Sequence, residues 1–159
     1  KTIIGPREVD YKEGVFVGYR WYESNNVDLR YCFGYGLSYT SFEYSDLDLS
    51  ATSLKGENSL KVSCNVKNTG ERDGKEVVQL YLRDLKASVP RPDKELRGFK
   101  KVEIKAGGQA KVEFELIPRD LAFWDETTNN WKIEDGEFEV LIGKSVRDVA
   151  LTKKFSYEN

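Results

Sequence analysis

The sequence predicts an all-β fold, an immunoglobulin-like two-sheet β-sandwich of about seven strands, preceded by an N-terminal aromatic-rich extension. From about residue 47 onward, apolar and polar residues alternate in short runs, and clusters of turn residues separate these runs. Apolar residues at helical spacing are nearly absent. The 159 residues leave room for one ordinary domain, and about seven strands suit a sandwich of roughly 100 residues. We therefore expect one core, enclosed by two antiparallel sheets.

The expected strands follow one another at short intervals. They lie at residues 47–54 and in the stretches SLKVSCNVKN, KEVVQLYL, ELRGFKKVEIK, AKVEFELI, NNWKI, GEFEVLIG and VALTKKFSY. The loop RDLKASVPRPDKE is no central strand, because its two prolines lack the amide hydrogen that strand pairing needs. Where the alternation is clearest, the apolar residues expected to face the core are Leu60, Val62, Cys64, Val66, Val78, Leu80, Leu82, Val112, Phe114, Leu116, Phe138, Val140 and Ile142.

The two cysteines help to choose between two kinds of sandwich. An antibody-type domain carries a Cys, Trp, Cys series across its strands, whereas here only Cys64 lies on a predicted strand. A fibronectin type III-like sandwich is therefore the better prediction. Two cysteines are too few for a disulfide framework, so Cys32 and Cys64 are expected to be free thiols, which leaves the compartment open.

Composition narrows the functional classes. The chain has no histidine, which excludes a Ser-His-Asp triad, a Cys-His pair and every zinc site that contains histidine. The net charge is -2 with both signs interspersed, and no apolar run approaches the roughly 20 residues of a membrane helix. We therefore expect no nucleic-acid partner, no membrane and no cofactor. Since the chain lacks methionine and starts at Lys1, it is expected to be a piece of a longer protein.

The N-terminal extension, residues 1–44, differs from the rest of the chain. It contains eleven of the twenty aromatic residues and one plausible strand, Gly14 to Trp21, which the polar turn SNNVD follows. The remainder is rich in aromatic residues and glycine, without clean periodicity. A buried ring contributes on the order of 2 to 3 kcal/mol, so burying half of these rings would match the net stability of a whole domain. The extension therefore needs a partner surface.

Several long motifs resemble one known family. YKEGVFVGYRWYES, followed by FGYGLSYTSFEYSDLDLS, resembles the end of the second catalytic-module domain of glycoside hydrolase family 3 enzymes and its connection to their fibronectin type III-like domain. VKNTGERDGKEVVQLYL, VPRPDKELRGFKKVEIKAGG, RDLAFWD and GEFEVLIGKSVRD continue the resemblance. Cys32 stands where the family often has proline. The resemblance implies that residues 1–44 are the terminal strand and linker of the upstream catalytic α/β sandwich domain, and that residues 45–159 are the fibronectin type III-like domain.

The resemblance also implies a role without catalysis. Enzymes of this family are typically β-glucosidases with a retaining mechanism, which needs two carboxyl groups about 5 to 5.5 Å apart. In the family one lies in a (β/α)8 barrel and the other commonly in the next domain, and no position of this chain matches either motif. The chain is expected to be a structural portion of such an enzyme, inactive alone, with the parent's catalytic domains as its partners. The alternative is a free-standing β-sandwich that binds carbohydrate or a protein.

Charged clusters suggest sites but have simpler interpretations. Three acidic pairs lie two residues apart on predicted strands, so both carboxylates of a pair point to one solvated face. They are Asp46 with Asp48, Glu113 with Glu115, and Glu137 with Glu139. A basic cluster comprises Arg97, Lys100 and Lys101 and is expected to be a solvent-exposed surface. We therefore name no residue as catalytic, substrate-binding or metal-binding.

Two further features concern contact with a sugar. Trp124 and Trp131 could form a stacking platform, but their context favours packing across a long loop and a hairpin end. Residues 22–24 and the loop from Arg83 to Glu95 could reach a bound sugar. Neither is assigned as a site.

Six rings of the extension are predicted to form the surface that docks on the catalytic domains: Tyr31, Phe33, Tyr35, Tyr39, Phe42 and Tyr44. Gly34 and Gly36 would let the backbone pass close to both partners. Residues 47–157 are then expected to fold without residues 1–40, and residues 1–44 alone are expected to stay disordered.

Overall fold

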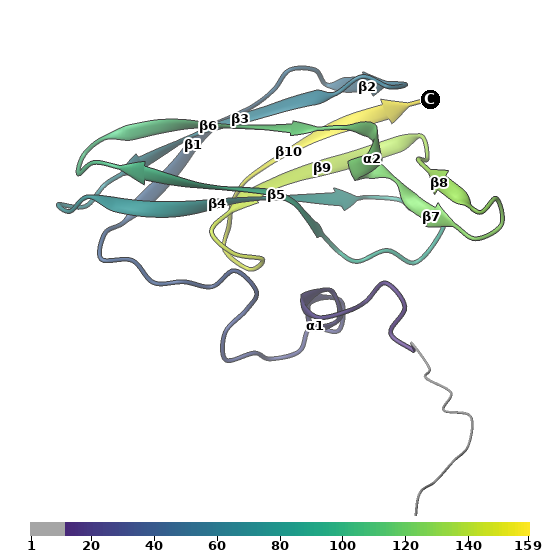
Figure 1. Ribbon diagram of the computed structural model, residues 1–159, viewed down its shortest axis with the longest axis horizontal. Helices are drawn as coiled ribbons and strands as arrows, with labels where there is room; N and C mark the ends of the chain where they lie inside the picture. The colour runs from purple at the N-terminus through teal and green to yellow at the C-terminus, as the bar shows by residue number, and fades with distance from the viewer. Residues whose placement is uncertain (1–11) are drawn as a thin grey trace, which may run out of the picture.

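Two β-sheets pack face to face in the computed structural model, which describes residues 12–159 (Figure 1). The elements are α1 (Tyr19–Ser24), β1 (Phe42–Leu49), β2 (Ser53–Lys55), β3 (Leu60–Asn68), β4 (Gly74–Asp84), β5 (Glu95–Ile104), β6 (Gln109–Leu116), α2 (Pro118–Leu121), β7 (Phe123–Asp125), β8 (Asn130–Lys132), β9 (Gly136–Gly143) and β10 (Val149–Glu158). One sheet has the order β1-β3-β6, and the other has the order β2-β10-β9-β4-β5. The prediction of an all-β sandwich is confirmed.

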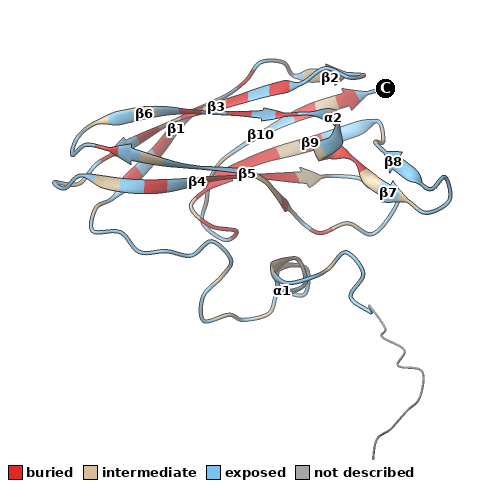
Figure 2. Cartoon of the chain, in the orientation of Figure 1, coloured by how far each residue is buried: buried red, intermediate tan, exposed pale blue. Residues whose placement is uncertain are grey.

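The core lies between the two sheets, as the alternation of the sequence predicts. All thirteen residues expected to face the core are buried. Figure 2 shows this as buried segments along the strands of both sheets. Their neighbours in sequence point outward, because successive side chains of a strand alternate between its faces.

Of the ten observed strands, β2 and β7 were not expected as separate strands, whereas β8 lies in the predicted stretch NNWKI. The expected first strand at residues 47–54 is divided: β1 ends at Leu49, and β2 begins at Ser53 and pairs in parallel with β10 in the other sheet. The chain therefore crosses between the sheets around residues 50–52. β7 and β8 form a separate two-stranded sheet. Each of these three strands has only three residues, which is too short for a periodic signal.

The prediction of a strand from Gly14 to Trp21 is wrong. Residues 19–24 form the helix α1, and the chain turns immediately before it. Gly18 has φ 63° and its carbonyl accepts hydrogen bonds from the N–H groups of Trp21 and Tyr22. An extended strand cannot pass through a residue in this conformation, so the helix begins there. Neither helix of residues 12–159 is long and apolar enough to cross a membrane.

Two of the six rings predicted to form a docking surface belong to the sandwich core instead. β1 begins at Phe42, and both Phe42 and Tyr44 are buried between the sheets. The Tyr44 hydroxyl donates a hydrogen bond to Glu76 Oε1 at 2.8 Å on the inner face of β4. A chain that begins at residue 47 would therefore lack most of β1.

Candidate functional site

Residues 12–41, here called the aromatic segment, lie on the outer face of the five-stranded sheet. Tyr81 on β4, Leu141 on β9 and Val146 in the following loop are buried there, against partly buried Tyr19 and Cys32 of the segment. The ring of Tyr19 stacks on Phe33 at 4.4 Å between centroids. The segment thus adds a third layer to the two sheets (Figure 1).

Gln79, which points outward from β4 and is buried, ties the aromatic segment to the sheet. Its Nε2 donates hydrogen bonds to the carbonyl oxygens of Gly34 at 3.3 Å and Lys144 at 2.5 Å. Its Oε1 accepts a hydrogen bond from the Tyr81 hydroxyl at 2.5 Å. Gly34 has φ +80°, and a Cβ there would overlap the Gln79 side chain. Glycine is therefore required at this close approach.

Two ion pairs anchor α1 to the same sheet. Arg20 Nη2 lies 3.1 Å from Glu95 Oε1 at the start of β5. Arg147 Nε, in the loop between β9 and β10, lies 2.8 Å from Glu23 Oε1, and its Nη2 donates to the Val27 carbonyl. Glu23, one of the residues considered for contact with a sugar, is thus engaged in anchoring the segment.

Much of the aromatic segment is exposed. Leu37 and Tyr39 are 89% and 93% exposed. The large apolar residues exposed on the segment, here called the aromatic face, are Val15, Val17, Trp21, Tyr22, Tyr31, Phe33, Tyr35, Leu37 and Tyr39. Four of the six predicted docking rings, Tyr31, Phe33, Tyr35 and Tyr39, are therefore available to a partner. Figure 2 shows this segment mostly in the colour of exposed residues.

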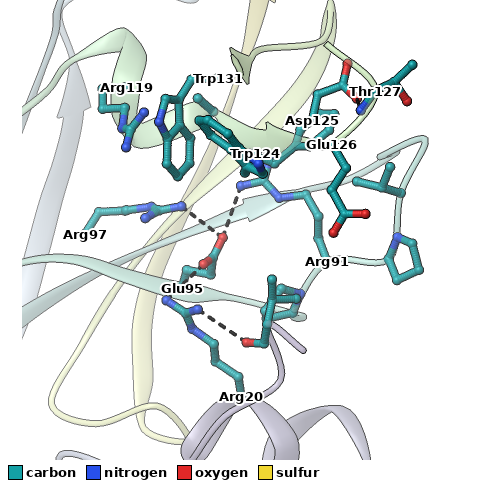
Figure 3. Close-up of a pocket in the computed structure, with 16 residues that line it drawn as sticks. Arg20, Arg91, Glu95, Arg97, Arg119, Trp124, Asp125, Glu126, Thr127 and Trp131 are labelled. Carbon is teal, nitrogen blue, oxygen red and sulfur yellow. Dashed lines mark hydrogen bonds and ion pairs between the residues drawn. The ribbon is translucent and has the colours of Figure 1, made fainter. Parts of the chain in front are cut away.

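A second feature is a cavity of about 610 Å³, here called the tryptophan pocket (Figure 3). It is lined by the aromatic segment, the β4–β5 loop, the start of β5, α2 and the β7–β8 hairpin. Trp124 and Trp131 stand opposite each other in the hairpin ladder, with their rings edge to face at 5.4 Å. The Arg119 guanidinium carbon lies 3.0 Å from the centroid of the Trp131 ring. Each tryptophan is 45% exposed, so neither belongs to the core.

Glu95 is buried beside this pocket within a cluster of arginines. Its Oε2 accepts hydrogen bonds from Arg91 at 3.1 Å and from Arg97 at 2.9 Å, while Oε1 pairs with Arg20. Arg91 also pairs with Asp84 at 3.1 Å. Burial lowers the pKa of Arg97, and its Nε is buried without a hydrogen-bond partner. The sequence suggested that Arg97 belongs to a solvent-exposed basic surface, and this is wrong for Arg97. Lys100 and Lys101 are exposed.

The three acidic pairs lie on solvated surfaces and are engaged by neighbouring groups. Hydrogen bonds from Asn65 and Ser45 hold the pKa of Asp46 below its usual value, and Lys111 does the same for Glu113. Glu139 lies 3.0 Å from Arg83. A general acid needs a raised pKa, so the lowered pKa values of Asp46 and Glu113 do not suit these two groups for that task. Residues 12–159 contain no group of three or more Cys, Asp or Glu side chains placed to hold a metal ion.

Comparison with known proteins decides the family. Residues 76–146 match the model described as the fibronectin type III-like domain. The chain is 47% identical over 143 residues to the thermostable beta-glucosidase B of Acetivibrio thermocellus, covering 90% of this chain and 19% of that one. The chain contains the fibronectin type III-like domain of glycoside hydrolase family 3 β-glucosidases.

A solved structure and a further relative agree with this family assignment. The fold matches the crystal structure of the Bifidobacterium adolescentis GH3 beta-glucosidase with TM-score 0.88 and 42% identity, over 96% of this chain and 23% of that one. An exo-alpha-(1->6)-L-arabinopyranosidase of Bifidobacterium breve is 43% identical, over 94% of this chain and 19% of that one. The chain thus spans about a fifth of the length of the curated relatives it matches.

Sequence reasoning missed the outer layer of this family 3 domain, although a signal was present. LYL in β4 and VLI in β9 are uninterrupted apolar runs, which are typical of strands covered on both faces. Such runs indicate that something lies on the outer face as well as in the core. Tyr81 and Leu141 are the residues that the aromatic segment covers.

Proposed function

We propose that the chain is the non-catalytic structural portion of a retaining β-glucosidase, whose other domains hydrolyse terminal β-D-glucosyl residues. In this proposal the residues before β1 link an upstream catalytic α/β sandwich domain to the fibronectin type III-like sandwich, which begins at Phe42 rather than at residue 45 as the sequence suggested. The domain buttresses the catalytic domains, and the aromatic face is where they dock.

One observation supports this proposal above the others: the aromatic segment is fixed on one side and uncovered on the other. Tyr19, Gln79 and the two ion pairs hold its inner side on the sheet. The segment nevertheless exposes nine large apolar residues within residues 15–39. Exposed apolar patches larger than a few hundred Å² are unusual on soluble monomers and mark surfaces of interaction.

The relatives support the same partner. Since the chain spans about a fifth of their length, most of each relative remains to supply a docking surface. The relatives include proteins named as β-glucosidases and as an arabinopyranosidase. One of each kind matches 90% and 94% of this chain, at 47% and 43% identity. A segment common to enzymes with different sugars is better suited to a structural task than to selecting the sugar.

The energy available from docking is large enough to matter. Burying one large apolar side chain contributes roughly 1.5 to 3 kcal/mol. Leu37 and Tyr39 alone, which are almost fully exposed, would thus contribute about 3 to 6 kcal/mol before the cost of ordering their side chains. This is comparable with the net stability of many domains.

The experiment compares the 159-residue chain with a double variant, Leu37→Ser with Tyr39→Ser. Phe99→Ser is the matched control, because Phe99 is 66% exposed but lies on β5, outside the aromatic segment. We expect the unmodified chain to self-associate in sedimentation and to bind a dye specific for apolar surface, the double variant to do so less, and the control to behave like the unmodified chain. An unmodified chain that is monomeric and dye-silent would contradict the proposal.

A further inference from the structure

We propose that the tryptophan pocket binds a neutral oligosaccharide. The inference depends on Trp124 and Trp131, which lie outside the aromatic face, although Val15 of that face also lines the pocket. It gives this chain a binding site of its own beside its structural role.

The pocket brings together two features that are far apart in the sequence. Its walls include the two tryptophans of the β7–β8 hairpin and residues 89–92 of the β4–β5 loop. The hairpin and this loop were two of the three places where the sequence suggested contact with a sugar; residues 22–24, the third, do not line the cavity. In the fold they border the same cavity of about 610 Å³, which falls in the range of ligand-binding pockets.

The exposed indole surfaces suit the apolar face of a sugar ring. The edge-to-face contact between Trp124 and Trp131, with Arg119 stacked on Trp131, accounts for the stability of the short hairpin. Each tryptophan is nevertheless 45% exposed, and both line the pocket. An amphipathic ring with one free face is suited to stacking against a flat ligand that carries hydroxyl groups at its edges.

The charges of the pocket are balanced, which favours a neutral ligand. Four arginines, Arg20, Arg91, Arg97 and Arg119, line it. Three acidic residues, Glu95, Asp125 and Glu126, line it as well, and Asp84 pairs with Arg91 from behind. Four positive charges therefore stand against four negative ones, so the pocket has no excess positive charge that would attract an anion.

The arginines of the pocket are already held in place. Glu95 fixes Arg20, Arg91 and Arg97 through its two oxygens (Figure 3). Ordering these side chains on binding therefore costs little. Planar guanidinium groups fixed in this way can donate hydrogen bonds to the hydroxyl groups of a sugar.

The test is a titration of the ¹⁵N-labelled 159-residue chain with cellopentaose, followed by NMR. The chain has three tryptophans, so the three indole N–H signals report separately on the pocket and on Trp21 of the aromatic face. We expect the signals of Trp124 and Trp131 to shift in a saturable way and the signal of Trp21 to stay in place. Trp124→Ala should weaken binding at least tenfold, and Trp21→Ala is the matched control with unchanged affinity.

A second variant tests the ordered arginines without removing a ring. Arg97→Lys keeps the charge beside Glu95 but loses the planar guanidinium, so we expect severalfold weaker binding. The proposal is overturned if no indole signal shifts at about 5 mM cellopentaose, a weak-binding limit, or if Trp21 shifts as much as the other two. It is also overturned if pentagalacturonate, an acidic oligosaccharide, binds more tightly than cellopentaose.

Discussion

The Tyr19 hydroxyl oxygen accepts a hydrogen bond from the backbone N–H of Leu96 at 2.8 Å, which joins α1 to the edge strand β5. The same ring meets Tyr81 edge to face, with 6.4 Å between the centroids. Tyr81 is fully buried although it points away from the sandwich core. The aromatic segment is therefore part of this chain's own fold, and only its outer side is left for a partner.

Tyr19→Phe tests the contact with β5. The change leaves the Leu96 N–H without its acceptor, so we expect the free energy of unfolding to fall by about 0.5 to 1.5 kcal/mol in urea denaturation. Tyr22→Phe is the control, because the Tyr22 hydroxyl lies on the same helix, is half-exposed and makes no hydrogen bond within residues 12–159. Equal midpoints for all three proteins would show that the hydrogen bond adds nothing to stability.

Gly34→Ala tests the close approach of the aromatic segment to β4. A Cβ at Gly34 meets the Gln79 side chain, and φ is +80°, so we expect a loss of stability of more than about 1 kcal/mol. Gly36→Ala is a matched control two residues away, since no atom lies within 4 Å of a Cβ built there. Thermal unfolding of both variants measures the difference, and similar losses would contradict this account of the contact.

Trp131→Ala should cost much less stability than a core substitution. Since Trp131 is 45% exposed, the cost of about 3 to 5 kcal/mol that is typical for a buried aromatic residue does not apply. Phe138→Ala is the comparison, because Phe138 is 1% exposed and stacks on Phe155. In urea denaturation, only Phe138→Ala should lower the free energy of unfolding by about 3 to 5 kcal/mol. A comparable cost for Trp131 would mean that the β7–β8 hairpin is part of the cooperative core.

Glu76→Gln should remove a pH dependence of stability. Burial is the main cause that raises the pKa of Glu76 above its usual value of 4.5; the Tyr44 hydroxyl and Lys144 oppose the shift, and Asp148 adds to it. The folded state then holds the proton more tightly than the unfolded chain, so the contribution of Glu76 to stability is present below pH 4.5 and declines as pH rises through its folded pKa.

Unfolding of both proteins in urea between about pH 4 and pH 8 measures the effect. We expect the stability of the unmodified chain to fall relative to the Gln variant as pH rises. A difference between the two proteins that stays constant across this range would mean that Glu76 titrates alike in the folded and unfolded states.

The core residues could be predicted from the sequence, but the packing of the aromatic segment on the outer face of the sheet could not. The thirteen predicted core residues are all buried, because a two-residue period reports directly which face of a strand is covered. The helix α1 was missed, since Val15, Phe16 and Val17 suggest a strand while the positive φ of Gly18 ends one. A positive φ at a particular glycine depends on tertiary contacts that local sequence does not contain.

The tryptophan pocket could not be predicted for a different reason. Its residues come from positions 15 and 20, from 89–97 and from 119–131, and only the packing of the sheets brings these positions together. The aromatic character of Trp124 and Trp131 was evident, but their exposure was not. The ion pairs of Glu95 with three arginines likewise join α1, the β4–β5 loop and β5, which no single motif specifies.

The most direct test of the proposed docking measures one double variant, Leu37→Ser with Tyr39→Ser, in two contexts. In the 159-residue chain, measured at a concentration low enough to keep it monomeric, both residues are almost fully exposed, so the thermal midpoint should change little. In the whole parent enzyme we expect the same change to lower the midpoint and the stability of aryl β-glucosidase activity, because buried apolar contacts worth roughly 1.5 to 3 kcal/mol each would be lost. An equal and small change in both contexts would contradict docking through the aromatic face.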